Sequence, residues 1–357
     1  MLASARARQR ITHLVGWILL VSACGKDKAA SEERPAPPPP VADGAVASQD
    51  AETASKNRIT IGVAPPRASA STALARRCVL GGDPLASECV GGGEGIAFGR
   101  DGTLYVVDGR QVRRYRRAAG EGCTLEPSGD PIELPPDNPR PQKVGGGPVY
   151  MRSGGAAWSL VRAGDAIYAH DFLGGLFRID RGKPEPACVD VFGYRRVAAL
   201  GKKLLVGRNG IEELKPGKTC KAVSAKIDDK VRGEVHAIGD TLYVSSGKSL
   251  QRYDGKDPVK LGEGTRICFV SGLTACGDGA CILDSNCMQI VQLGTDGKVL
   301  RVIDDEKLFA ARPWSLQEAV TADGGDVFVL ARHRDKANDK EICEAAVYEL
   351  PAAVFAL

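Results

Sequence analysis

Residues 95–115 read GIAFGRDGTLYVVDGRQVRRY, and this stretch decides the fold. Short apolar or alternating segments are separated by Gly99-Arg100-Asp101-Gly102 and by Asp108-Gly109. Gly and Asp between alternating apolar residues form the tight turns of β-hairpins. The stretch therefore predicts three antiparallel strands that are joined by two turns.

Similar units follow at a nearly constant spacing. They span residues 160–179, 197–214, 235–253, 268–293 and 318–350. From Ile167 to Leu204 to Leu242 to Cys281, the steps are 37, 38 and 39 residues. A period of this size with about four strands per unit is typical of a β-propeller. We therefore expect an all-β fold, a six-bladed β-propeller, with seven blades as the alternative.

One step in the repeat is longer than the others. Leu104 and Ile167 are 63 residues apart, and the stretch 131–155 between them is rich in Pro and Gly and lacks the motif. The extra length fits either a long insertion or a degenerate seventh blade. Because the motif is missing, we predict an insertion.

The two ends of the repeat region predict how the ring closes. A Cys-started strand follows the third strand of several units, at Cys123, Cys188 and Cys220, and the similar segment 77–80 precedes the first unit. The last unit ends near Leu350, with little chain left for an outer strand. We therefore predict that residues 78–80 form the outer strand of the last blade, which leaves no blade with an open edge.

Residues 95–108 resemble the repeat of the NHL and related six-bladed propellers, in which glycine, an alternating apolar strand, Asp-Gly and Leu-Tyr-Val follow one another. The other units match only at the core around Gly-x-Leu-Tyr-Val, and the resemblance covers roughly residues 75–350. It is specific for the fold and carries little information about activity, because one fold hosts many functions.

The N-terminal residues predict export from the cytoplasm. Arg6, Arg8 and Arg10 precede the apolar run 14–21, which small residues follow, and this order is typical of a signal peptide. The run is too short for a bilayer core, which needs about twenty apolar residues. We therefore expect residues 1–23 to be a signal peptide rather than a permanent membrane span.

The segment Val21-Ser22-Ala23-Cys24 resembles the bacterial lipobox, which implies that Cys24 is lipidated and becomes the first residue of the mature chain. The alternative is an ordinary signal peptide with a chance Cys. Residues 24–73 contain Pro35-Ala36-Pro37-Pro38-Pro39-Pro40 and few large apolar side chains, so we expect a disordered tether. Residues 74–357 then form the propeller domain. Since residue 25 is Gly rather than Asp, the resemblance favours the outer membrane, with the domain facing the periplasm or the exterior.

Charge gives no reason to propose a nucleic-acid partner. The formal net charge is +4, and removal of the three Arg of the signal peptide lowers it to +1. No basic block occurs in the folded part, so electrostatic attraction to phosphates is not expected.

Apart from Cys24, the chain has an even number of cysteines, which predicts up to five disulfides in an oxidising compartment. The candidates are Cys78, Cys89, Cys123, Cys188, Cys220, Cys268, Cys276, Cys281, Cys287 and Cys343. For Cys78, we consider a bond to Cys343 across the seam and a rival bond to Cys89. Cys268, Cys276, Cys281 and Cys287 could instead bind a metal, but they lack the C-x₂₋₄-C pairs of zinc sites apart from Cys276-x₄-Cys281.

Candidate site residues are expected where second strands end, because propeller function lies in the central channel and in the loops of one face. The candidates are Asp108, His170, Asp171, Arg208, Asn209, Asp284 and His333. Gluconolactonase-like propellers hold a divalent metal with Glu, Asn and Asp from such positions. The first unit lacks that Glu, and Asp108-Gly109 and Asn209-Gly210 also read as ordinary turns.

Three histidines, His170, His236 and His333, stand in different units of the repeat. They could bind a metal or transfer a proton near the axis, although scattered histidines are the simpler interpretation. No cofactor is predicted, because the Gly-rich loops do not match a phosphate-binding pattern.

We therefore predict a lipid-anchored envelope propeller that binds or scaffolds an envelope partner without catalysis. The partner could be a protein, a glycan or a peptide, and the insertion 131–155 is the loop that we expect to contact it. The alternatives are a metal-dependent gluconolactonase-like hydrolase and an outer-membrane assembly factor.

Overall fold

The folded part of the chain lies within residues 67–357, one of two units into which the chain divides. The computed structural model describes residues 73–82, 84–85, 95–120, 122–135, 142–144, 147–149, 158–171, 175–188, 196–207, 210–216, 221–224, 233–253, 259–337 and 340–356. The predicted signal peptide, Cys24 and nearly all of the predicted tether lie outside these residues. Within the described part, no helix has the length and apolar character needed to cross a bilayer.

The described strands form seven sheets, and six of these contain four strands in the same arrangement, so that each of the six is one blade. In the first three blades, the strands follow one another along the chain from the inside of the ring outwards. Blade 1 contains β3 (Ile96–Phe98), β4 (Leu104–Asp108), β5 (Gln111–Arg117) and β6 (Thr124–Pro127). Blade 2 contains β10 (Trp158–Ala163), β11 (Ala166–Asp171), β12 (Gly175–Arg178) and β13 (Glu185–Cys188). Blade 3 contains β14 (Val197–Leu200), β15 (Lys203–Gly207), β16 (Ile211–Lys215) and β17 (Lys221–Ser224).

The last three blades repeat this order. Blade 4 contains β18 (Glu234–Ile238), β19 (Thr241–Ser246), β20 (Ser249–Tyr253) and β21 (Val259–Leu261). Blade 5 contains β22 (Val270–Cys276), β23 (Gly279–Asp284), β24 (Gln289–Leu293) and β25 (Val299–Asp304), followed by the short helix α1 (Asp305–Leu308). Blade 6 contains β26 (Ser315–Thr321), β27 (Val327–Ala337), β28 (Lys340–Leu350) and, on the outside, β1 (Arg76–Arg77). A 3₁₀ turn, Ala352–Phe355, follows β28.

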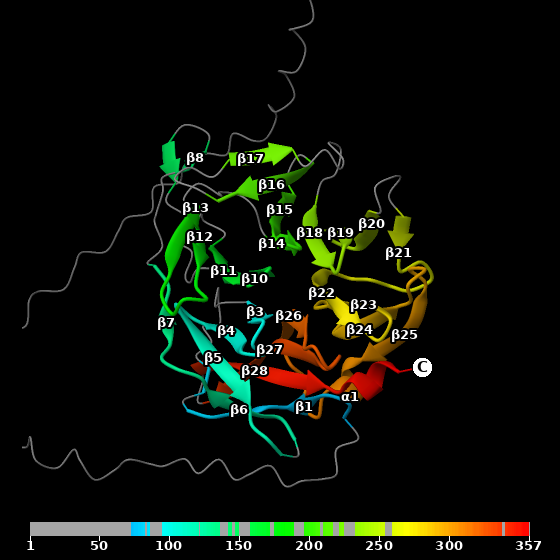
Figure 1. The fold of residues 1–357 in the computed structure, drawn as a ribbon. Helices are drawn as coiled ribbons and strands as arrows, with labels where there is room; N and C mark the ends of the chain where they lie inside the picture. The colour runs from blue at the N-terminus through cyan, green and yellow to red at the C-terminus, as the bar shows by residue number, and fades with distance from the viewer. Residues whose placement is uncertain are drawn as a thin grey trace, which may run out of the picture. The chain divides into compact units, whose positions relative to one another are not determined.

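The six innermost strands form a closed ring. They contact one another in the order β3, β10, β14, β18, β22 and β26, and β26 contacts β3 again. Figure 1 looks along the axis of this ring, with the inner strands around the centre and the outer strands at the rim. The six-bladed β-propeller predicted from the repeat is therefore confirmed, and the alternative of seven blades is wrong.

Two-residue turns explain why the repeat folds into hairpins. In blade 4, Ile238 pairs with Thr241, so only Gly239 and Asp240 form the connection between the first two strands. Gly239 has a φ of 56°, a left-handed conformation that such turns require and that costs glycine nothing. Gly at this point of the motif thus fixes the register that points alternate side chains into the core.

The hydrophobic core is divided into six clusters, each between two neighbouring blades. Between blades 1 and 2, for example, Val107 packs in one cluster with Trp158 and Ile167. Trp158 is fully buried, and its ring centroid lies 5.8 Å from that of Phe177. Each blade therefore depends on both neighbours to bury its two faces, which is why a single repeat could not fold alone.

The first residues of the domain close the ring, as predicted, but with a different register. β1 pairs antiparallel with β28 and so completes blade 6. The outer strand is Arg76–Arg77 rather than residues 78–80, because the chain crosses to blade 1 at Cys78. There β2 (Val79–Leu80) pairs with β6, in parallel. The opening segment thus belongs to the last blade and to the first.

Side chains also join blades 1 and 6. Arg117 of β5 forms ion pairs with Asp326 at 2.9 Å and with Glu349 of β28 at 2.7 Å. Glu349 is almost fully buried, and this burial raises the pKa of its carboxyl group in spite of the Arg117 charge. Arg117 thus pairs with two carboxylates of blade 6, and the seam is polar as well as apolar.

The cysteines form disulfides, as predicted, but neither pairing considered for Cys78 is right. Cys78 bonds to Cys123, so the bonds to Cys343 and to Cys89 are both wrong. The reason is the crossing of the opening segment, which places Cys78 beside the strand of blade 1 that begins at residue 124.

The remaining described cysteines are also oxidised. Cys268 bonds to Cys287, and Cys276 bonds to Cys281, so these four do not form the alternative metal site. Cys188 and Cys343 are disulfide-bonded too. Cys188 ends the outer strand of blade 2 instead of starting it. Cys89 and Cys220 lie outside the described residues.

The long step between the first two units is an insertion, as predicted, and it contains strands of its own. β7 (Ile132–Glu133) pairs with β5 next to the outer strand of blade 1. β8 (Gln142–Val144) and β9 (Gly147–Val149) pair with each other and with no blade. The insertion is therefore an addition to a six-bladed ring.

Candidate functional site

The ring has two different ends. At one end, which we call the start face, the first strand of each blade begins and the second strand ends, as the pairing of Trp158 with Asp171 shows. At the opposite end, which we call the turn face, a short hairpin joins the first strand to the second, as at Gly164. Residues can thus be placed along the axis from their position in these two strands.

A cavity of about 490 Å³ lies inside the ring and is lined by the first strands of all six blades. This volume falls within the range of about 300 to 1,000 Å³ that is usual for ligand pockets. Most of its lining is backbone and small or aliphatic side chains. The charged side chains among its described lining residues are Arg162, Arg196 and Glu318.

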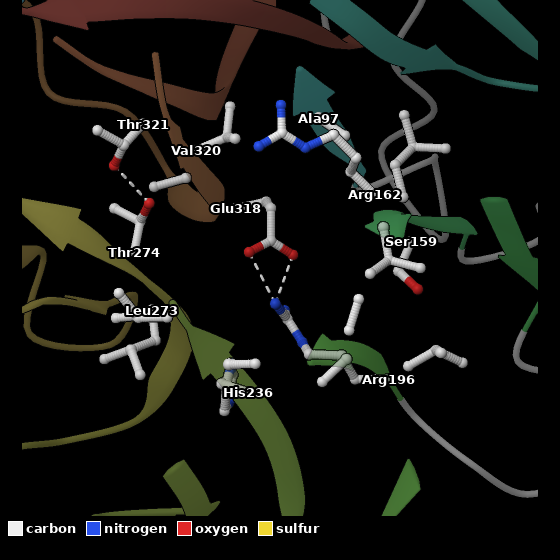
Figure 2. Close-up of a pocket in the computed structure, with 18 of the residues that line it drawn as sticks. Ala97, Ser159, Arg162, Arg196, His236, Leu273, Thr274, Glu318, Val320 and Thr321 are labelled. Atoms are coloured by element: carbon white, nitrogen blue, oxygen red, sulfur yellow. Dashed lines mark hydrogen bonds and ion pairs between the residues drawn. The ribbon is translucent and has the colours of Figure 1, made fainter. Parts of the chain in front are cut away.

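Arg196 and Glu318 form an ion pair that crosses the channel near the start face. Arg196 precedes β14 of blade 3, Glu318 lies in β26 of blade 6, and these two blades are opposite one another in a ring of six. Arg196 Nη1 lies 2.6 Å from Glu318 Oε2 and 2.7 Å from Oε1 (Figure 2). The pair therefore spans the axis, and we call it the Arg196–Glu318 bar.

The guanidinium of the bar is held by two more blades. Arg196 Nη2 donates a hydrogen bond of 2.7 Å to the carbonyl oxygen of Ser271 in blade 5. Its Nε lies 3.9 Å from a carboxylate oxygen of Glu234 in blade 4. One arginine thus contacts three other blades, and most of its hydrogen-bonding capacity is used within the ring.

Two irregularities in the first strands make room for the bar. The pairing of β22 slips between Val270 and Gly272, and that of β26 slips between Leu316 and Glu318. Such β-bulges turn a strand locally and change where side chains point. Gly272 also leaves space for the bar, because a Cβ at this position would lie 3.2 Å from Glu318 Oε1, which is closer than most real Cβ contacts.

His236 lines the cavity from β18 and is fully enclosed. Burial, followed by the positive charge of Arg196, holds the pKa of its imidazole well below 6.5. Its Nε2 lies 3.0 Å from the hydroxyl oxygen of Ser245. The ring is therefore neutral at neutral pH and belongs to a hydrogen bond inside blade 4.

The part of the cavity nearer the turn face has a different character. Arg162 pairs with Ile167 one step from the hairpin of blade 2, and Thr321 forms the last pair of β26 before its turn. The hydroxyl oxygens of Thr321 and Thr274 lie 2.7 Å apart. Among the residues that the structure describes, Arg162 has no ion-pair partner. Figure 2 shows it on the cavity wall, beside Ala97.

The residues predicted from the sequence gather at the start face but one strand away from the cavity. Asp108, Asp171 and Asp284 end the second strands of blades 1, 2 and 5, and each is buried. None of them, and neither His170 nor His333, is among the described residues that line the cavity. Asn209 and Arg208 lie outside the described residues.

Asp108 and His333 make contacts within their own blades. A carboxylate oxygen of Asp108 lies 2.6 Å from Arg113 Nε within blade 1. His333 Nε2 lies 2.7 Å from the hydroxyl oxygen of Tyr348, whose pKa burial raises to about 12. A role for the candidate residues in ligand binding stays a prediction.

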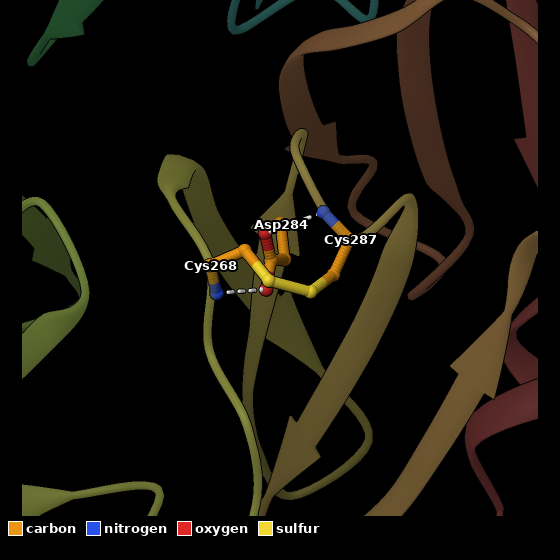
Figure 3. A group of neighbouring side chains, drawn as sticks. All are labelled: Cys268, Asp284 and Cys287. Atoms are coloured by element: carbon orange, nitrogen blue, oxygen red, sulfur yellow. Dashed lines mark hydrogen bonds between the residues drawn. A yellow bond between two sulfur atoms is a disulfide. The ribbon is translucent and has the colours of Figure 1, made fainter.

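One group in the described part of the chain brings three ligand atoms close enough for a metal, namely Cys268, Asp284 and Cys287 (Figure 3). The two sulfur atoms are joined in a disulfide. Asp284 accepts hydrogen bonds from the backbone N–H groups of Cys268, Phe269 and Cys287 and from the Gln289 amide. A carboxylate offers about four acceptor positions, so these contacts leave none for a cation. The group anchors the loops at the start of blade 5.

Sequence reasoning missed the bar because it considered the ends of second strands. Arg196 stands one residue before a first strand, and Glu318 stands within one. The sequence did indicate that both residues are unusual, since a charged residue in or beside an apolar first strand needs a partner of opposite charge when it is buried. Their pairing across 122 residues could not be deduced before the ring was known.

The start face also carries structure beyond the blades. β27 and β28 are eleven residues long, and their residues 333–337 and 340–344 pair beyond the end of β26 at Ser315. Trp314 precedes β26, and about half of it is exposed. The Arg334 guanidinium carbon lies 5.2 Å from the centre of its ring. The insertion leaves blade 1 at this face too, after β7 pairs with Gln111.

No family model and no curated protein matches the sequence. Among solved structures, a luciferin-regenerating enzyme shares 11% identity, with a TM-score of 0.47 and coverage of 75% of this chain and 92% of that chain. Streptogramin B lyase shares 11% identity, with a TM-score of 0.43 and coverage of 74% and 96%. BamB from Moraxella catarrhalis shares 12% identity, with a TM-score of 0.37 and coverage of 72% and 82%. At these values the matches say nothing about activity, and the propeller architecture rests on the strand pairing described above.

Proposed function

We propose that this chain is a lipid-anchored β-propeller of the bacterial cell envelope that binds a partner protein through its start face and catalyses no reaction there. The lipid anchor and the envelope location follow from the resemblance of residues 21–24 to a lipobox. The even number of cysteines apart from Cys24 supports an oxidising compartment.

The observation that carries the proposal is the concentration of additional chain at one face. The extended hairpin of β27 and β28 and the insertion after β7 both leave the ring at the start face. Neither is needed to complete a four-stranded blade. Additions of this kind on a rigid scaffold are where binding residues are commonly found.

Trp314 and Arg334 give this face a suitable contact point. Tryptophan and arginine are enriched in the energetically important centres of protein interfaces, where a flat ring and a guanidinium bury large areas. Trp314 is one of only three large apolar side chains that are exposed among the described residues. Because Trp314 and Arg334 already stack on each other, a partner could bury both side chains with little loss of conformational entropy.

The charged groups near the channel support binding rather than catalysis. Glu318 is held at two oxygens by Arg196, and Asp284 has four donors around its carboxylate. A general base needs a carboxylate that can reach a substrate proton. These two carboxylates are committed to the structure instead.

The test is site-specific photo-crosslinking in living cells of the organism that makes the protein. A photoreactive amino acid replaces Trp314 or Arg334 in the full chain, and a control chain carries it at the exposed Asp240 of the turn face. We expect a discrete crosslinked protein from both start-face positions and not from Asp240. The same products from all three positions, or none from any, would contradict the proposal.

A direct assay addresses the enzyme alternative. If the purified chain hydrolysed lactones in a metal-dependent way, and Asp171→Ala abolished this activity, the gluconolactonase-like alternative would replace the binding proposal. Metal analysis of the same preparation measures whether a stoichiometric divalent ion accompanies the protein.

A further inference from the structure

The channel contains a half in which one charged side chain, Arg162, has no ion-pair partner among the described residues. The Arg196–Glu318 bar crosses the axis near the start face, and beyond it the cavity continues to the hairpins of the turn face, since Gly164, Gly201 and Gly239 line it. We call this second half the turn-face pocket and define it by Arg162, Ala199, Ile238, Thr274, Val320 and Thr321. The partner-binding surface proposed above lies at the other end of the ring.

Arg162 is the most informative residue of this pocket. It lines the cavity, and no described residue forms an ion pair with it, whereas Arg196 in the same cavity contacts three blades. Arg100 on the neighbouring hairpin of blade 1 also has a partner, Asp165, at 2.8 Å. A guanidinium with five donors and no internal acceptor is suited to an acceptor from outside the chain.

The wall opposite Arg162 is polar, but its hydroxyl groups are already hydrogen-bonded. The hydroxyl oxygens of Thr274 and Thr321 lie 2.7 Å apart, and Thr321 Oγ1 donates to the carbonyl oxygen of Ala275. Both hydroxyl hydrogens are therefore used within the fold, and the pair offers a bound molecule acceptor positions only. The buried hydroxyl of Ser159 lies outside the turn-face pocket, at the level of the bar, because Ser159 precedes the hairpin glycine Gly164 by as many residues as Arg196 precedes Gly201.

Charge and lining restrict the chemical class of the molecule. Arg196 is already balanced by Glu318 and also lies close to Glu234, so Arg162 is the lining cation that a bound group would balance. A group with a single negative charge balances Arg162, whereas the second charge of a dianion would find no further cation among the described lining residues. Leu160, Val161, Ile238, Leu273 and Val320 supply apolar lining for a hydrocarbon part.

We propose that the turn-face pocket binds a small organic monocarboxylate, with its carboxylate on the Arg162 guanidinium and its hydrocarbon chain along the aliphatic wall. Arg162 offers two parallel N–H donors to the two oxygens of a carboxylate, which is the arrangement that makes arginine selective for this group. The proposal does not depend on partner binding at the start face, because the two sites open at opposite ends of the ring.

The test measures binding of hexanoate to the purified full chain by isothermal titration calorimetry, with hexanamide as the uncharged probe of the same shape. We expect saturable binding of hexanoate and at least ten-fold weaker binding of hexanamide, since only the carboxylate forms charged hydrogen bonds. Arg162→Gln should weaken hexanoate binding at least ten-fold, and Arg162→Lys should retain part of the affinity because it keeps the charge without the two-pronged geometry.

Arg100→Gln is the matched control. It removes the same charge from the turn face, next to the same hairpin, but Arg100 does not line the cavity. We expect wild-type affinity in this variant. Absence of hexanoate binding, equal affinity for hexanamide, or unchanged affinity in Arg162→Gln would each overturn the proposal. These results leave the crosslinking test of the start face unaffected, so the two proposals can fail separately.

Discussion

At the scale of single residues, the channel is organised by a charged pair that the fold brings together from opposite sides. Arg196 and Glu318 are 122 residues apart in sequence and meet at hydrogen-bonding distance. Both side chains are largely withdrawn from water, with 17% and 8% of their surface exposed. Each charge is therefore tolerated inside the ring because the other is present.

Removing one partner of this pair should cost more than removing both. We expect Glu318→Ala to lower the free energy of unfolding by about 3 kcal/mol, because Arg196 is then left in the channel without its main counter-charge. Adding Arg196→Ala to that variant should recover part of the loss. Urea unfolding of the two single variants and the double variant measures the coupling. Strictly additive losses would show that the two side chains do not stabilise each other.

His236 gives the protein a predictable response to acid. Burial holds the pKa of its imidazole well below 6.5 in the folded protein, and in the unfolded chain it returns to about 6.5. Below pH 6.5 the unfolded state therefore binds a proton that the folded state does not, so stability falls as the pH falls. The slope from this residue is at most about 1.4 kcal/mol per pH unit.

The corresponding variant is His236→Gln, which keeps a polar group that can bond to Ser245. We expect its free energy of unfolding to decrease less between pH 7 and pH 5 than that of the wild type. Urea denaturation at both pH values measures the difference. An identical pH dependence in the two proteins would mean that His236 is protonated in the folded state.

The sequence predicted the location of polar residues better than their roles. Asp108, Asp171 and Asp284 do lie at the ends of second strands, since the turn pattern fixes where these strands stop. Their burial one strand outside the cavity could not be seen in a one-dimensional pattern. The environment of Arg162 was likewise hidden, because it depends on which side chains the closed ring places around it.

At the scale of elements, the most consequential feature is the opening segment that two blades share. Arg76–Arg77 pair with β28, and Val79–Leu80 pair with β6, so four residues bridge the last blade and the first. The Cys78–Cys123 disulfide fixes the crossing point between these pairings. The chain runs directly from one blade to the next at the other five junctions, but not from blade 6 to blade 1. Without these pairings and the disulfide, we expect the ring to open most easily at this seam.

Two disulfides, one at the seam and one in blade 5, provide a comparison of loop length. Cys78 and Cys123 are separated by 45 residues, and Cys276 and Cys281 by only 5. Loop-closure entropy gives about 4 kcal/mol for the longer loop and about 2 kcal/mol for the shorter one. We expect replacement of Cys78 and Cys123 by Ala to lower the urea midpoint more than the same change at Cys276 and Cys281. The reverse order would show that the seam is held by other contacts.

Strand order was predictable at this scale, and exact partners were not. Repeated Gly and Asp turns with apolar alternation revealed all six blades, because hairpins are local structures. Ring closure was also predictable, since the last unit lacked an outer strand. The shift from residues 78–80 to Arg76–Arg77, and with it the true partner of Cys78, depended on packing between residues at the two ends of the domain.

At the scale of the whole molecule, the proposed function combines a membrane anchor, a tether and a rigid ring. The two faces of the ring differ. The start face carries the extended β27–β28 hairpin, and the cavity continues to the turn face. A protein held at a membrane by its N-terminal residues can engage one ligand at each face, because the faces lie at opposite ends of the channel.

The anchor is tested by metabolic labelling of cells with a radioactive or clickable fatty acid. We expect the full chain to carry the label and to sediment with membranes, whereas Cys24→Ala should lose the label and accumulate as the unprocessed precursor. Cys24 is the residue to which the lipobox resemblance assigns the lipid. Labelling that persists in Cys24→Ala would refute lipidation at this position.

The shared opening segment also sets the order of events when the protein is made. Ribosomes synthesise Arg76–Arg77 first, but their partner β28, Lys340–Leu350, is the last strand of the ring along the chain. Until that last hairpin has emerged, the nascent chain holds an unsatisfied strand and five or fewer blades with exposed apolar sides. The ring can therefore close only after β28 has been synthesised, and we expect chains cut short before β28 to be substrates of quality-control proteases.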